Sequence, residues 1–273
     1  MRVRLPADKF HYAAKKRAQN ARKGARLSRN LQAEVKKVIE GTQETKLIIG
    51  SPTHYPTGQT LENWTSFSSA ITSTNEVYNI IPPIAQGTDD FQRIGSSIQP
   101  VKMTMKLNVA LDNTTSFSGS ASIYVDAFIM KAKTVKTATQ TANVLTGSLM
   151  NNGQGFNVPY DGTSYTAMLP VNKADFVQIK RHRFKLQLVG AQPNSVVGSG
   201  VPAQSLSAYT GSLSVNIPLP AKYLYQDSSQ TVPTNDFPFL MLGFCATDFY
   251  GGISPVTPRI YAQAQTHLYY KDA

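Results

Sequence analysis

Gln86–Leu111 reads QGTDDFQRIGSSIQPVKMTMKLNVAL, and its second half alternates between apolar and polar residues. Side chains of a strand point alternately to its two sides, so the pattern predicts a long strand with one face in a core. Because proline cannot donate to a sheet ladder, the ladder is expected to start after Pro100 or to bulge around it. The residues expected on the core face are Val101, Met103, Met105, Leu107, Val109 and Leu111.

The first half of this stretch is a polar turn that contains Gly87, Gly95 and the adjacent acids Asp89 and Asp90. Two neighbouring carboxylates suit a hard cation at a subunit contact. Paired acids in a turn are more often simply solvated, so we predict no metal ligand here. We predict no cofactor for the chain.

Strand-like segments continue to the end of the chain, separated by turn-forming residues. Between these segments Thr139–Met150 suggests a short helix, and residues 42–85 suggest an extended segment with one or two edge strands. Many strands with little helix predict an all-β sandwich or jelly roll. The later predicted strands are Ala121–Met130, Asp175–Val189, Leu213–Leu219, Phe237–Ala246 and Arg259–Tyr270.

Positive charge is concentrated at the N-terminus of the 273-residue chain. Residues 1–40 contain 12 Lys and Arg and 3 Asp and Glu, which accounts for nine of the net charge of +11. Residues 1–26 have few large apolar groups and are not expected to fold alone. Apolar residues recur at helical spacing over Leu27–Ile39, which predicts a short amphipathic helix.

These features predict a basic nucleic-acid-binding arm over residues 1–40, because each Lys or Arg can neutralise a phosphate and release a counterion. A nuclear import receptor would recognise the same basic clusters, and a tail that only keeps the protein soluble is the third interpretation. The predicted nucleic-acid-binding residues are Arg2, Arg4, Lys9, Lys15, Lys16, Arg17, Arg22, Lys23, Arg26, Arg29, Lys36 and Lys37.

A second basic group lies in the predicted strand Asp175–Val189. Arg181, Arg183 and Lys185 are two residues apart, so they are expected to share one face of the strand. Three cations in line on a strand could follow a phosphate backbone, or they could contact acidic residues of a neighbouring subunit. The sequence favours the subunit interface slightly.

The chain carries no recognisable catalytic pattern. Its four histidines are far apart and never have the spacing of zinc ligands. The sequence has no nucleophile elbow, phosphate-binding loop or dinucleotide-binding glycine motif, so we predict that it is not an enzyme. The single cysteine, Cys245, lies in an apolar run and is predicted to be a buried small residue. We expect no signal segment and no membrane insertion, because no apolar run approaches the length of a spanning helix.

A basic arm followed by the turn QGTDDFQRIG and a long strand is similar to satellite tobacco necrosis virus coat protein. It also resembles the capsid proteins of small circular single-stranded DNA viruses that encode a replication initiator. In both groups an acidic glycine turn followed by Gln-Arg-x-Gly introduces the first jelly-roll strand. The chain has extra residues at 42–75 and 191–210, so no calcium ligands are carried over. The resemblance continues in order through Asp175–Leu188, Ile217–Tyr225, Phe237–Phe244 and Tyr269–Asp272.

The resemblance implies a single jelly roll, an eight-stranded antiparallel β-sandwich, that assembles into an icosahedral shell around a viral genome. It implies a homo-oligomer, with 60 copies favoured, located in the virion and in the host nucleus if the genome is DNA. Single-stranded DNA is favoured, and RNA stays open because phosphates are alike in both. The expected organisation is an arm at 1–40, an extended segment at 41–85 and a shell domain at 86–273. The alternatives are a nucleic-acid-binding β protein that forms no shell and a carbohydrate-binding jelly roll.

Overall fold

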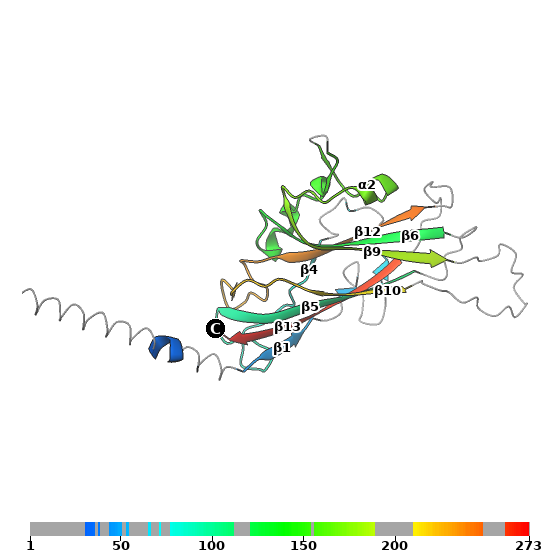
Figure 1. Cartoon of the computed structure of the whole chain (residues 1–273). Helices are drawn as coiled ribbons and strands as arrows, with labels where there is room; N and C mark the ends of the chain where they lie inside the picture. Colours follow the sequence, from blue (N-terminus) through cyan, green and yellow to red (C-terminus); the bar gives the residue numbers. More distant parts are fainter. Residues whose placement is uncertain are drawn as a thin grey trace, which may run out of the picture. The chain divides into compact units, whose positions relative to one another are not determined.

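The computed structural model describes residues 31–35, 38, 44–50, 53–54, 65–66, 71, 77–111, 121–153, 156–188, 210–247 and 260–272. The chain divides into two compact units, Met1–Glu44 and Thr45–Ala273. In the first unit, residues 31–35 and 38 are helical, within the predicted amphipathic segment. The second unit, which we call the body, contains the described strands (Figure 1).

The body consists mainly of antiparallel strands, as predicted, with short helical turns between β6 and β9. The strands are β1 (Lys46–Ile49), β2 (Thr53–His54), β3 (Thr65–Ser66), β4 (Tyr78–Asn79), β5 (Ser97–Leu111), β6 (Ala121–Ala132), β7 (Met150–Asn151), β8 (Asn157–Val158), β9 (Phe176–Leu188), β10 (Thr210–Asn216), β11 (Tyr223–Leu224), β12 (Pro238–Thr247) and β13 (Ile260–Asp272). The helical turns are η2 (Ala138–Asn143), η3 (Thr146–Ser148) and α2 (Ser164–Met168).

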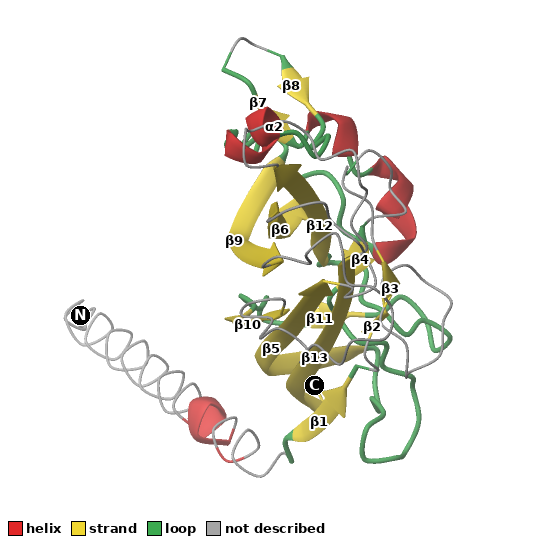
Figure 2. Cartoon of the chain, turned by 90° about the vertical axis from the view of Figure 1, so that its right-hand side faces the viewer, coloured by secondary structure: helices red, strands yellow, loops and turns green. Residues whose placement is uncertain are grey.

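Two sheets lie face to face in the body (Figures 1 and 2). The large sheet has the order β1-β13-β5-β10, with β11 also pairing with β5 and with β2 and β3 pairing with β13. The small sheet has the order β4-β12-β6-β9. The stretch before residue 86 was expected to hold one or two edge strands, and β1 and β4 each end a strand order. The described part of residues 45–85 contributes β1, β2 and β3 to the large sheet and β4 to the small sheet.

The main core fills the space between the two sheets. The large sheet contributes Met103, Met105, Leu107 and Val109 from β5, and all four side chains are buried. Their polar neighbours point to the other side, which confirms the alternation predicted for this strand. Burying a large aliphatic side chain stabilises the fold by about 1.5–3 kcal/mol, so this strand anchors the core.

One residue of the predicted core face of β5 is on the wrong side. Val101 is 51% exposed, whereas Pro100 and Ile98 before it are buried. The register explains the difference, because Tyr269 pairs with Lys102 and Tyr270 with Pro100, leaving Val101 as the extra residue of a bulge. A bulge reverses the alternation. The structure thus confirms the bulge expected beside Pro100, and the bulge explains why the prediction for Val101 is wrong.

A second core lies on the opposite face of the small sheet. It is covered by residues 133–175, which connect β6 to β9 and which we call the covering segment. Figure 1 shows this segment in green over β6 and β12, on the side away from the large sheet. Phe128 and Met241 of the sheet are fully buried beneath it, as is Tyr160 of the segment itself. The strands β6 and β12 are apolar on both faces because each face has its own core.

Candidate nucleic-acid interface and the buried arginine–aspartate cluster

The predicted basic arm lies outside the described residues at all twelve of its basic positions. Its described neighbours Leu31, Val35 and Val38 are helical and exposed. The contact of the arm with nucleic acid therefore stays a prediction from charge and composition.

The second basic group is described in full, and its two arginines have a partner within the chain. Asp126 of β6 is paired with Arg183 across the ladder to β9, and its side chain is fully buried. Nε of Arg183 donates to one carboxylate oxygen of Asp126 at 2.9 Å, and Nη2 donates to the other at 2.7 Å. Nη2 of Arg181 lies 3.4 Å from the same carboxylate. This bidentate geometry is the strong form of an ion pair.

The same guanidinium groups hold the covering segment on the sheet. Arg181 donates to the backbone oxygens of Leu169 at 2.6 Å and Ala167 at 2.5 Å. Arg183 also donates to the Ala167 oxygen. These two carbonyls lie in and just after α2, where a helix leaves its last carbonyls without helical partners. The two arginines therefore donate hydrogen bonds both to the carbonyls at the end of α2 and to the buried carboxylate on β6.

Tyr160 completes this arginine–aspartate cluster from the covering segment. Its hydroxyl donates to Asp126 at 3.2 Å, and its ring lies against Gly243 of β12, where a Cβ would come within 2.6 Å of Cε1 of Tyr160. Burial raises the pKa of the Tyr160 phenol, and the Asp126 charge raises it further. The hydrogen bonds to Asp126 raise the pKa of Arg183 against the opposing effect of partial burial. Both pKa shifts reinforce the states that these groups already have at neutral pH, a neutral Tyr160 and a charged Arg183.

Among the described contacts, Lys185 alone of the three predicted cations makes no bond to this cluster, and its side chain is exposed. The side chains of Arg181 and Arg183 are 19% and 36% exposed. Their common face was predicted correctly from the spacing, but their partner Asp126 was not predicted. The sequence did contain a signal for this partner, because Asp126 is the one charged residue in the apolar run Ala121–Met130.

The turn before β5 is built around a buried arginine. Arg93 is fully buried. Its guanidinium donates hydrogen bonds mainly to backbone oxygens, those of Gly95 at 2.5 Å, Asp227 at 2.9 Å and Gln230 at 2.8 Å. Its guanidinium also lies 4.1 Å from the centre of the Tyr225 ring. The arginine of the sequence QGTDDFQRIG therefore fixes this turn to the 225–230 loop.

The acids of the same turn face solvent. Asp89 and Asp90 are exposed, and the Asp89 carbonyl and amide are both bonded to Gln92. In the described part of the chain, no group of three or more His, Cys, Asp or Glu side chains is arranged to hold a metal ion. No helix among the described residues is long and apolar enough to cross a membrane.

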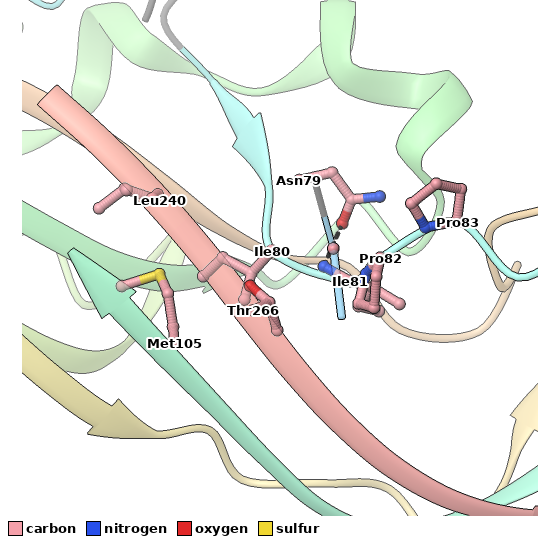
Figure 3. Close-up of a pocket in the computed structure, with 10 residues that line it drawn as sticks. Asn79, Ile80, Ile81, Pro82, Pro83, Met105, Leu240 and Thr266 are labelled. Carbon is pink, nitrogen blue, oxygen red and sulfur yellow. Dashed lines mark hydrogen bonds between the residues drawn. The ribbon is translucent and has the colours of Figure 1, made fainter. Parts of the chain in front are cut away.

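A cavity of about 250 Å³ opens between the sheets beside β4 (Figure 3). Ile80, Met105 and Leu240 contribute apolar surface, and none of its described lining residues is charged. Asn79 uses its side-chain oxygen to accept from the Ile81 amide at 3.0 Å, which turns the chain after β4. Asn79 and Thr266 are the polar side chains among its described lining residues.

Comparison with known proteins finds no matching family model and no curated protein of significant similarity. The function must therefore be argued from the residues and their geometry.

The buried thiol gives a direct test of the second core. Cys245 is 2% exposed, and burial raises its pKa. Because the thiolate is the reactive form, we expect native protein at pH 8 to react with a disulfide reagent far more slowly than protein unfolded in guanidinium. The absorbance of the released thiol measures the rate. Equally fast reaction in both states would show that the covering segment does not protect β12.

Proposed function

We propose that this chain is the capsid protein of a small icosahedral virus and that its body is a single jelly roll. The observation that carries the proposal is the nested pairing of its eight main strands. In chain order they are β1, β4, β5, β6, β9, β10, β12 and β13, and the first pairs with the last, the second with the seventh, the third with the sixth and the fourth with the fifth. This nesting, divided between two facing sheets, is the topology of a jelly roll, a fold used by viral capsids and lectins.

In this arrangement β5 is the third strand and not the first, as the resemblance implied. The turn QGTDDFQRIG still leads into it, but β1 and β4 precede it in the sheets. β1 and β4 would thus open the proposed roll, and the proposed shell domain is the compact unit Thr45–Ala273 and not residues 86–273 alone.

The charge distribution distinguishes a capsid from a lectin. The first 40 residues carry a net charge of +9, and the remainder carries +2. A nearly neutral β body suits contact with many copies of itself, while a polycationic arm suits a packaged polyanion. Closed symmetry then covers the exposed edges of every copy with the same surface. Single-stranded DNA is the favoured genome, and about 60 copies, the smallest icosahedral number, is the favoured size.

The test is the assembly state of the purified full-length protein. We expect closed particles in electron micrographs and, for 60 copies of a 29.8 kDa chain, a protein shell of about 1.8 MDa by native mass spectrometry or sedimentation. Nucleic acid extracted from the particles should be degraded by a nuclease specific for single-stranded DNA.

Other results would support other functions. A mass near 180 copies would overturn the smaller shell, and sensitivity to ribonuclease alone would overturn DNA. A monomer that binds oligonucleotides at high protein concentration would indicate a nucleic-acid-binding β protein. A monomer that binds sugars after removal of the arm would indicate a lectin.

A further inference from the structure

The outward faces of the two sheets differ in kind. The small sheet presents large apolar side chains, such as Phe239 and Met241, to the covering segment. The outward face of the large sheet is polar, and its side chains on β5 and β10 are mostly exposed. We call this outward surface of β13, β5 and β10 the polar face. Figure 1 shows the two sheets as separate layers, with the covering segment on the small sheet only.

The polar face carries positive charge and no carboxylate. Lys102 and Lys106 are exposed on β5, and His267 and Tyr269 lie on the neighbouring β13. The one acid of these three strands, Asp272, is the last residue of β13 and is bonded to Lys46 at 2.8 Å. The other outward residues are hydroxyls and amides: Thr104, Asn108, Ser212, Ser214, Asn216, Gln263 and Gln265.

The register places these groups in rows. Lys102 is opposite Tyr269, and Lys106 is opposite Gln265 on one side and Ser214 on the other. Residues of a strand rise by about 3.3 Å each, so the two lysines are about 13 Å apart along β5. Adjacent strands are about 4.8 Å apart, so the Tyr269 side chain lies beside Lys102. An aromatic ring next to a cation on a flat polar surface is the arrangement that holds unpaired nucleotides, by stacking on a base and neutralising a phosphate.

The chain enters the body at this sheet. Thr45, the first residue of the body, is directly followed by β1, the edge strand of the large sheet. Among the described residues, the covering segment packs on the small sheet, and no carboxylate of β5, β10 or β13 lies on the polar face.

We propose that the polar face is a second contact surface for single-stranded nucleic acid, with Lys102 and Lys106 on phosphates and Tyr269 on a base. The inference rests on the proposed packaging function and adds to it a site in the body. The assigned contacts go to phosphates and to the face of a base, so binding is expected to be independent of base sequence. The body, and not the arm alone, then sets where the strand runs.

The first test compares two double variants of the full-length protein that remove the same charge. Lys102→Gln with Lys106→Gln alters the polar face, and Lys136→Gln with Lys173→Gln alters exposed positions of the covering segment. Affinity for a fluorescent 30-nucleotide oligo-dT is measured from 50 to 300 mM salt. Each neutralised phosphate contributes about 0.7 to the slope of log affinity against log salt, so the polar-face variant should lose about 1.4 and the control nothing.

The second test addresses stacking at Tyr269. Tyr269→Phe keeps the ring, while Tyr269→Thr keeps a strand-forming residue without it. Stacking of one base changes affinity by about 5-fold to 150-fold, so we expect that loss for the Thr variant and unchanged binding for the Phe variant. An oligonucleotide containing 5-iododeoxyuridine should cross-link under ultraviolet light to the tryptic peptide of residues 260–271.

Equal slopes for both lysine variants, or equal affinities for both tyrosine variants, would overturn the inference. Loss of particles by folded Lys102→Gln, Lys106→Gln protein would also overturn it and would assign the polar face to contact between copies. The proposed function fails separately, when unaltered protein neither assembles nor binds the oligonucleotide. If the polar-face variants assemble and package nucleic acid as the unaltered protein does, the inference is wrong but the proposed function is still supported.

Discussion

Deletion of residues 1–26 is expected to remove most of the salt dependence of nucleic-acid binding. The deletion takes away nine Lys and Arg and one acid, Asp8. If about nine phosphates are neutralised at about 0.7 each, the arm contributes a slope of roughly −6 in log affinity against log salt. The truncated protein should keep a slope of about −1 to −2, and its affinity at physiological salt should be weak. Titration of a single-stranded oligonucleotide at several salt concentrations measures both quantities.

The matched control keeps the chain length and removes only the charge. Replacing the nine basic residues of 1–26 with Gln should give the same slope as the deletion, because counterion release depends on charge. The midpoint of thermal unfolding should move by about 1–2 °C at most in either variant, since no residue of this segment belongs to the described cores. A slope that survives truncation, or a body that unfolds after it, would contradict the assignment of the arm as the packaging element.

Removal of both arginines from β9 is expected to have the largest effect on stability. Arg181→Gln with Arg183→Gln leaves the fully buried Asp126 carboxylate without its cations. Breaking a buried pair in this way costs about 3–5 kcal/mol in the free energy of unfolding. For a body of this size that corresponds to a fall of about 6–20 °C in the midpoint of thermal unfolding, which calorimetry measures directly.

Two controls separate loss of the pair from loss of surface charge. Lys185→Gln removes an exposed cation from the same face of the same strand, so unfolding should change by less than about 0.5 kcal/mol. Adding Asp126→Asn to the double arginine variant removes the buried charge and should restore part of the lost stability. A double variant as stable as the Lys185 variant would show that the arginines do not fasten the covering segment, and the phosphate or subunit-contact interpretations would then apply to all three cations.

Local sequence patterns were sufficient for several parts of the fold. The alternation in Gln86–Leu111 predicted a long strand, and Pro100 predicted that the ladder would start after it or bulge around it, because side-chain direction and amide bonding are properties of the strand itself. The strands Phe237–Ala246 and Ala121–Met130 were predicted from the sequence as well, because both segments are runs of mainly apolar residues. The concentration of charge in residues 1–40 is likewise a property of the sequence and needs no fold to be recognised.

Pairing between distant segments was decided only by the tertiary structure. No local pattern shows that β1 and β4 open the two sheets, because strands of two to four residues carry little periodicity and gain their stability from β13 and β12. The same is true of the cations on β9: their common face follows from spacing, but their partner Asp126 lies more than 50 residues away in the sequence. A buried carboxylate needs cations from whatever strand lies beside it, and strand order, not composition, determines which strand that is.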